Sequence, residues 1–218
     1  MSNRPVIFVG PSLGVKEACA ILDADYRPPA GQRDVISAAR ERPPMIGLID
    51  GVFLTSLPPS PMEVLEALRL GVPILGASSL GALRAVELEP FGMVGIGRIF
   101  EMFRRGELVA DDEVALLFAP EDFRPLSEPL VNIRHALAAA AAAGIISARA
   151  RAHLLWLARK MYFAERSWPL LLRQADGRVS ASSLGRLREF VATHDFDLKK
   201  QDAIDLLQRV RRTLDADA

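Results

Sequence analysis

The chain has 218 residues, 27 of them basic and 27 acidic, and half of its residues are apolar. This length supports one or two domains with a sizeable core, and the balanced charge argues against an extended nucleic-acid or anionic-membrane surface. A single cysteine, Cys19, excludes an internal disulfide and a cysteine-rich metal site. No apolar run has the length of a membrane span, and the N-terminus lacks a signal-peptide pattern. We therefore expect a soluble, cytoplasmic protein.

The first half of the chain alternates short apolar runs with helical periodicity, which is typical of β–α units. Strands are expected at 5–9, 45–49 and 72–76, and helices at 15–22, 32–41, 61–70, 80–89 and 98–105. The proline-containing segment 26–30 is expected to be extended or a turn, and glycines interrupt the segment 92–97. An apolar run at 114–118 ends this half. A strand, a helix and a strand within 45–76 predict a right-handed parallel crossover.

The second half shows helical periodicity only, at 129–143, 147–165, 167–175, 183–193 and 198–213. We predict an open, mostly parallel α/β sheet with flanking helices over about residues 5–118, followed by an all-helical part. The expected domains are 1–120 and 121–218. The first holds 11 basic and 15 acidic residues and the second 16 and 12, so the zero net charge hides a modest dipole.

Ligands of open α/β sheets bind beyond the carboxyl ends of the strands, which directs attention to the loops 10–14, 50–60 and 76–81. The first loop, which contains Gly10 and Ser12, has three residues between its glycines where a Walker loop has four. The Rossmann glycine spacing is missing as well. We therefore favour a tight strand-to-helix turn over a nucleotide-binding loop.

The third loop places Ser78 and Ser79 at a strand-to-helix turn between Gly76 and Gly81. This is the general geometry of a nucleophile elbow, although Gly-x-Ser-x-Gly itself is not matched, and amides at the helix start could form an oxyanion hole. The spacing alone favours the simpler interpretation, in which Ser79 caps the helix 80–89.

A serine nucleophile needs a base, and the sequence offers few. The three histidines, His135, His153 and His194, are isolated in the helical half, each more typical of a helix surface than of a catalytic group. Only four of the basic residues are lysines (Lys16, Lys160, Lys199 and Lys200), and Lys16 alone lies in the α/β part. Arg84, one helical turn beyond the serines, could hold an anion but cannot act as a base.

The acidic run Asp111-Asp112-Glu113 has the residue types of a metal site. It has no complementary ligand pattern, so we interpret it as a solvated cap and expect neither a metal nor another cofactor.

Several of these motifs together resemble the core of the TfuA-like protein family, over about residues 5–118. The residues that carry the resemblance are Asp50-Gly51-x-Phe53, Gly71-Val-x-Ile-x-Gly76-Ala-Ser78-Ser79-Leu-Gly81-Ala-Leu-Arg84-Ala-Val-Glu87-Leu, Phe91-Gly-Met-x-Gly95-x-Gly97 and Asp111-Asp112-Glu113-Val-Ala. The segments Gly10-Pro11-Ser12-Leu13 and Tyr26-x-Pro28-Pro29-Ala30 fit the same family.

The resemblance implies a role beside a YcaO-type enzyme, which uses ATP to activate a peptide amide before sulfur replaces its oxygen. Proteins of this family are understood to hydrolyse the C-terminal thiocarboxylate of a ThiS-like sulfur carrier, which releases sulfide, and to help the YcaO enzyme engage its peptide. The implied partners are therefore a YcaO-type enzyme and a sulfur carrier protein, with neither nucleic acid nor membrane.

The family's active site is described as a Ser-Lys pair, which places the nucleophile of this chain at Ser79 or Ser78, with Ser79 preferred. The implied substrate-binding residues are Asp50, Gly10, Ser12, Arg84 and Glu87. Relatives often carry His-Lys-Glu at the start of the helix after the Asp-Gly-x-Phe loop, where this chain has Pro61-Met62-Glu63. With Met62 in place of that lysine, either the base is Lys16, Glu63 or another group, or this member of the family is catalytically weak. A non-catalytic adaptor is the alternative function, and a nucleotide-binding module is a second alternative.

Overall fold

A computed structural model describes residues 4–52 and 56–216. Phe53 of the family motif lies outside the described residues. The chain forms two compact units. The first unit comprises residues up to 111, 120–124 and the chain from 199 onward, and the helical unit comprises 112–119 and 125–198. We describe each unit by itself.

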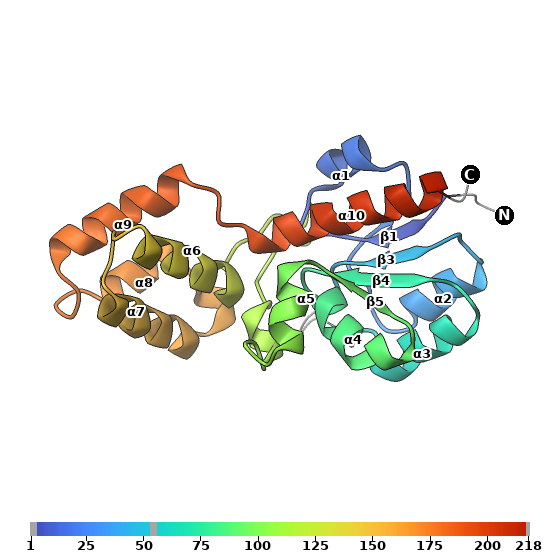
Figure 1. The fold of residues 1–218 in the computed structure, drawn as a ribbon, viewed down its shortest axis with the longest axis horizontal. Helices are drawn as coiled ribbons and strands as arrows, with labels where there is room; N and C mark the ends of the chain where they lie inside the picture. Colours follow the sequence, from blue (N-terminus) through green and yellow to red (C-terminus); the bar gives the residue numbers. More distant parts are fainter. Residues whose placement is uncertain (1–3, 53–55, 217–218) are drawn as a thin grey trace. The chain divides into compact units, whose positions relative to one another are not determined.

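Five parallel strands form the sheet of the first unit, in the order β2-β1-β3-β4-β5 (Figure 1). They are β1 (Val6–Phe8), β2 (Asp25–Arg27), β3 (Ile46–Leu48), β4 (Ile74–Ala77) and β5 (Val94–Ile96). All four pairings are parallel, which confirms the predicted fold class. The strand order changes direction between β1 and β3, and in doubly wound sheets the ligand-binding crevice lies at such a switch point.

Helices cover both faces of this sheet. They are α1 (Val15–Ile21), α2 (Asp34–Arg40), α3 (Pro61–Arg69), α4 (Leu80–Leu88), α5 (Gly97–Arg104) and α10 (Leu198–Ala216). Figure 1 shows α1 and α10 on one face of the sheet and α2 to α5 on the other. Ala203, Leu206 and Val210 of α10 are fully buried in one apolar cluster with Ile7 and Ile49 of the sheet region.

The last helix therefore belongs to the first unit, which differs from the division that we expected at residue 120. The sequence showed the apolar face of this helix but not which surface covers it. Two of the strands were not predicted as such. β2 overlaps the start of the segment 26–30, which we interpreted as extended or a turn, and β5 lies in the glycine-punctuated segment 92–97. Residues 114–118 form no strand, and Phe118 makes one isolated bridge to Pro125.

The helical unit contains α6 (Leu130–Ala142), α7 (Ala148–Lys160), α8 (Trp168–Gln174) and α9 (Ala181–Thr193). Leu137, Leu154, Leu171 and Leu187, one from each helix, are fully buried in a shared apolar core. The helix predicted at 147–165 is shorter, because α7 ends at Lys160 and a 3-10 turn follows at Phe163–Glu165. In the described part of the chain, no helix is both long enough and apolar enough to cross a membrane.

Asp202 of α10 caps the N-terminus of α5. Its side chain is fully buried, and its two carboxylate oxygens accept hydrogen bonds from the amides of Arg98 (2.9 Å) and Ile99 (2.7 Å). Gly97 adopts φ +92°, and a Cβ there would lie 2.3 Å from the Asp202 carboxyl carbon. A charge from the last helix thus satisfies amide donors that an α-helix start leaves unpaired. Burial nevertheless raises the pKa of Asp202 to about 6.

This raised pKa predicts a pH-dependent stability. Between about pH 4 and pH 6 the folded state binds the Asp202 proton more tightly than the unfolded chain, so this carboxyl makes the free energy of unfolding fall as the pH rises. We compare the free energy of unfolding of the wild type with that of Asp202→Asn. The wild-type value minus the variant value should decrease across this window, by at most about 3 kcal/mol, and stay constant above it. Urea unfolding of both proteins from pH 4 to pH 8 measures this. A constant difference would contradict the shift.

Candidate functional site

Three polar side chains from different strand ends form a hydrogen-bonded chain at the switch point of the sheet. The Ser78 hydroxyl donates to the Ser12 hydroxyl (2.8 Å), which donates to Oδ1 of Asp50 (2.6 Å). Ser12 follows β1, Asp50 follows β3 and Ser78 follows β4. Asp50 and Ser78 are fully buried and Ser12 is 2% exposed. We call this arrangement the Ser-Ser-Asp chain. It orders two hydroxyl protons toward one carboxylate.

The loop after β1 is folded around the Asp50 carboxylate. Oδ2 of Asp50 accepts hydrogen bonds from the amides of Gly10 (2.9 Å) and Ser12 (3.0 Å). Gly10 is also tightly packed, since a Cβ there would lie 2.5 Å from Cγ of Pro29. Amides that a phosphate-binding loop would turn toward a ligand are therefore already paired with protein. This supports the interpretation of the loop as a tight turn.

Ser78 adopts a backbone conformation that is rare for a residue with a side chain. Its φ is +66°, and the amide of Ser79 donates to the carbonyl of Ala77 (2.8 Å), which closes a three-residue turn around Ser78. A non-glycine residue in the left-handed region costs of order 1 kcal/mol or more, and such strain gathers at functional sites. A strained serine between a strand and a helix is the backbone feature of a nucleophile elbow.

Glycine at position 81 lets α4 start directly against β3. A Cβ on Gly81 would lie 1.8 Å from the carbonyl oxygen of Leu48, and the amide of Gly81 donates to the carbonyl of Ile49 (3.2 Å). Two amides at the start of α4, those of Ser79 and Gly81, are thus paired with backbone carbonyls. The oxyanion hole expected there is not formed by these two donors.

Ser79 stands at the N-cap position of α4, as predicted, but its side chain makes no capping hydrogen bond. It is half-buried, whereas Ser78 is the serine that is joined to a carboxylate. The pairing favours Ser78 over our preferred Ser79, and which serine reacts stays a prediction.

Among the described residues, neither Lys16 nor Glu63, the bases that the sequence suggested, is hydrogen-bonded to the Ser-Ser-Asp chain. Lys16 is exposed on α1 and forms no hydrogen bond or ion pair with the described residues. Glu63 is buried, and its carboxylate accepts hydrogen bonds from the amides of Arg33 (2.8 Å) and Val35 (3.1 Å) at the start of α2. Met62 is 60% exposed. The acceptor of the Ser-Ser-Asp chain is therefore Asp50, and the role of Lys16 stays a prediction.

Arg84 holds the loop that precedes α3. Its Nε donates to the carbonyl of Pro59 (2.8 Å) and its Nη1 to Oε2 of Glu87 (2.7 Å). The Arg84 side chain is 13% exposed and that of Glu87 is 44% exposed. The contact with Pro59 ties the loop 56–60 to α4, and the contact with Glu87 lies within α4. Substrate binding by either residue stays a prediction.

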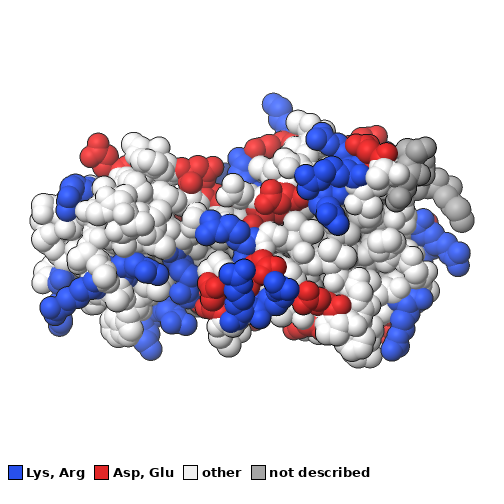
Figure 2. Space-filling model, in the orientation of Figure 1, with Lys and Arg blue, Asp and Glu red and all other residues white. Residues whose placement is uncertain are grey.

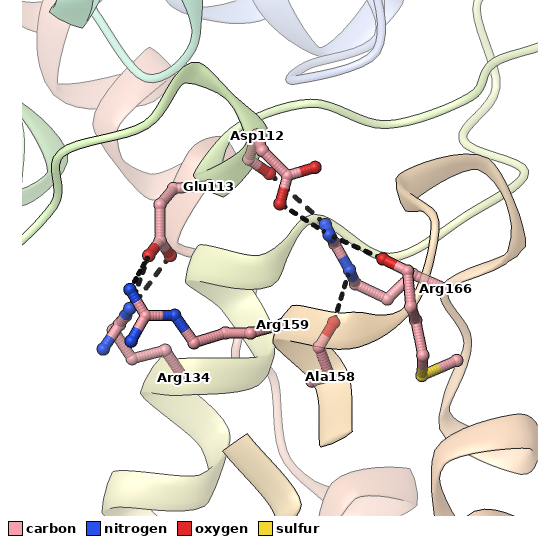
Figure 3. Close-up of polar contacts among 7 residues, drawn as sticks. Asp112, Glu113, Arg134, Ala158, Arg159 and Arg166 are labelled. Atoms are coloured by element: carbon pink, nitrogen blue, oxygen red, sulfur yellow. Dashed lines mark hydrogen bonds and ion pairs between the residues drawn. The ribbon is translucent and has the colours of Figure 1, made fainter. Parts of the chain in front are cut away.

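The acidic motif at 111–113 is paired with arginines of the helical unit (Figure 3). The buried Glu113 carboxylate forms a short ion pair with Arg134 and a longer one with Arg159 (3.9 Å). Arg166, which is fully buried, donates to Oδ2 of Asp112 (2.8 Å) and to backbone carbonyls that include that of Ala158 (3.2 Å). The solvated cap that we predicted is thus wrong for Glu113, whose role is to anchor its segment to the helices. Within 4–52 and 56–216, no group of three or more metal-ligating side chains gathers.

A family model described as TfuA-like protein matches residues 50–167, more than half of the chain. The chain belongs to the TfuA-like protein family. This family is associated with YcaO-dependent thioamidation. The matched region contains Asp50, both serines, Arg84 and the paired acidic motif, and it begins after Ser12. The curated proteins include no match to this sequence.

The strain at Ser78 predicts an unusual order of stability among variants. Glycine adopts φ +66° without the penalty that alanine carries, and both variants lack the hydroxyl. Ser78→Gly should therefore be more stable than Ser78→Ala by about 1 kcal/mol. At Ser37, an exposed position inside α2, alanine should instead be more stable than glycine by about 1 kcal/mol, because a helical backbone favours alanine. Chemical denaturation of the four variants measures both differences, and the same order at both positions would contradict the strain.

Proposed function

We propose that this protein is an accessory protein of YcaO-dependent peptide backbone thioamidation that hydrolyses the C-terminal thiocarboxylate of a ThiS-like sulfur carrier. The sulfide released in this way supplies the sulfur, and the protein also assists the YcaO enzyme in engaging its peptide. Family membership supports the pathway. The observation that carries the hydrolase assignment is the Ser-Ser-Asp chain, which ends on a strained serine.

In the proposed reaction, Oγ of Ser78 attacks the thiocarboxylate carbon. The Ser78 proton passes to Ser12 while the Ser12 proton passes to Asp50, along the two hydrogen bonds present in the structure. Asp50 then returns its proton through Ser12 to the sulfur of the tetrahedral intermediate. The sulfur leaves as HS⁻, and the carrier stays joined to Ser78 as an ester. Water then attacks the ester, and the serine hydroxyl is restored. The net change converts one thiocarboxylate and one water into one carboxylate and one hydrogen sulfide.

The geometry suits this leaving group. Asp50 is held in place by two backbone amides as well as by Ser12, so it needs no reorganisation to receive a proton. The thiocarboxylate sulfur is anionic and needs one proton to leave as HS⁻, which is a better leaving group than an amide ion or an alkoxide. A nucleophile and a relay that takes up and returns one proton are therefore the functional groups that this proposal requires.

A non-catalytic adaptor is the second candidate, and the burial of Ser78 favours it. The hydroxyl is 0% exposed, so a substrate reaches it only if the covering residues move. An adaptor would use the same protein to hold the YcaO enzyme and the sulfur carrier together, with the Ser-Ser-Asp chain serving to fix the three loops.

Substitution of the two serines separates these functions. Ser78→Ala should lower the rate of sulfide release from thiocarboxylated carrier by at least about 100-fold, because a nucleophile has no substitute. The rate of Ser79→Ala should stay within about threefold of the wild-type rate, because the Ser79 hydroxyl is not part of the Ser-Ser-Asp chain. A sulfide-trapping assay measures the rates, and circular dichroism checks the fold. Wild-type turnover by Ser78→Ala would overturn the hydrolase assignment, and loss in Ser79→Ala alone would move the nucleophile to Ser79.

Ser12 provides an independent test of the relay. Ser12→Ala leaves the nucleophile in place but interrupts proton transfer to Asp50, so kcat should fall by about 10- to 100-fold with little change in KM. Ser12→Thr retains the hydroxyl and should recover part of the rate. Equal rates for Ser12→Ala and the wild type would remove Ser12 from the mechanism.

A further inference from the structure

A groove of about 650 Å³ lies between α8 and α9 of the helical unit. Its lining on α9 extends from Ala181 to Val191 along one face of that helix. At 1.5 Å per residue, this face is about 15 Å long. The groove therefore has the length of about three helical turns.

The floor of the groove is apolar and continuous with the core of the helical unit. Leu172 and Leu184 are buried in that core, and Trp168 and Val191 pack against it while they stay partly accessible. Pro169 lines the groove beside them and is exposed. An occupant with apolar side chains would therefore extend an existing core and remove these side chains from water, which is favourable.

Gly185 opens a space in the groove that the described chain does not fill. It lies inside α9, where glycine is less stable than other residues, and it is exposed. A Cβ at this position would lie more than 4 Å from every described atom beyond its own helix. Gly81 differs, because its close contact with Leu48 leaves no room for a side chain. No neighbour within the chain requires glycine at position 185, so the open space suits a group from outside.

Two arginines give the groove a positive charge. Arg173 of α8 and Arg188 of α9 line it and are exposed, and neither forms an ion pair or side-chain hydrogen bond with the described residues. Asp176 also lines the groove, and its Oδ1 accepts a hydrogen bond from the amide of Gly177 (3.0 Å).

The surrounding surface has the same sign of charge. The segment 125–198 holds ten basic and six acidic residues. Figure 2 shows more Lys and Arg than Asp and Glu side chains over the region of α7 to α9, at the left. The charge of the groove and of its surroundings therefore complements carboxylates.

From these features we propose that the groove between α8 and α9 binds a short acidic amphipathic helix of a partner protein. The apolar side chains of this helix pack on Trp168 and Val191 and enter the space over Gly185, and its carboxylates pair with Arg173 and Arg188. The groove does not include the Ser-Ser-Asp chain, so the proposal does not rest on the proposed hydrolysis.

The fluorescence of Trp168 tests this proposal in the full-length protein. The chain has two tryptophans, so Trp156→Phe leaves Trp168 as the reporter. The probe is an amphipathic peptide of Leu, Glu and Ala with about 14 residues, which is long enough to form a helix. Saturable binding should move the emission of Trp168 to shorter wavelength and reduce its quenching by acrylamide. A peptide with Gln in place of every Glu should bind at least about fivefold more weakly, because it lacks the charge-assisted contacts.

Two double variants, each combined with Trp156→Phe, distinguish the groove from general attraction to a basic surface. Arg173→Ala/Arg188→Ala should bind the Glu peptide about tenfold more weakly than the Trp156→Phe protein, because it loses both pairing arginines. The matched control Arg151→Ala/Arg186→Ala removes the same charge from exposed positions of α7 and α9 outside the groove. It should bind the peptide within about twofold of the Trp156→Phe protein.

A substitution at Gly185 tests the open space. Gly185→Gln, also made in Trp156→Phe, should not lower the melting temperature, because glutamine favours a helix more than glycine does. It should nevertheless weaken binding of the Glu peptide at least about tenfold, because its side chain occupies the groove. Absence of saturable binding, equal affinities of the Glu and Gln peptides, equal weakening in the control variant or unchanged binding by Gly185→Gln would each overturn the proposal. Self-association that Gly185→Gln abolishes would assign the groove to a second copy of this chain instead.

Discussion

The buried carboxylate of Asp50 is the group around which the loops of the candidate site are arranged. A carboxylate that is taken out of water must be surrounded by donors, and here the donors are the amides of Gly10 and Ser12 and the Ser12 hydroxyl. The loop after β1 must therefore curl over the end of β3. Because the Ser12 hydroxyl donates its proton to the hydrogen bond with Asp50, its oxygen is free to accept one, and the Ser78 hydroxyl donates to it. One buried charge thus sets the position of three loop ends.

Carboxylates perform the same structural task twice more in the first unit. Glu63 of α3 satisfies amides at the start of α2, and Asp202 of α10 does so at the start of α5. In each case a side chain from one helix completes the hydrogen bonding of another, so the helices are linked by directional contacts as well as by apolar packing. Asp202 explains why the last helix belongs with the sheet, since α5 begins at a glycine with no capping side chain of its own.

Sequence patterns predicted the parts of this fold whose signal is local. The apolar strands β1, β3 and β4 and the turns that follow them could be placed because each run is bounded by glycine or proline. β2 and β5 are three residues long and lie next to proline or glycine, so they exist as strands only because a neighbouring strand pairs with them. The packing of α10 against the sheet could not be predicted either, because the apolar face of an amphipathic helix does not indicate which surface covers it.

The candidate site was predictable as a location but not as a set of partners. Parallel strand ends brought Ser12, Asp50 and Ser78 to one edge of the sheet. No local sequence pattern distinguishes Ser78, with its φ of +66° and its hydrogen bond to Ser12, from Ser79. The acidic motif was misread because its partners, Arg134 and Arg166, follow it by many residues on separate segments.

A left-handed serine persists only where its surroundings determine the conformation, and two constraints act on Ser78. Gly81 allows α4 to start against the carbonyl of Leu48, which leaves a single short turn between β4 and α4. The hydrogen bond to Ser12 then stabilises the rotamer in which the Ser78 hydroxyl points back toward the sheet. A helix cap would need neither the strain nor the burial, and Ser79 shows that a half-buried serine fits this turn without a capping bond. The strain at Ser78 is therefore best explained by the direction in which it presents its hydroxyl, which is toward the hydrogen-bond acceptor Ser12.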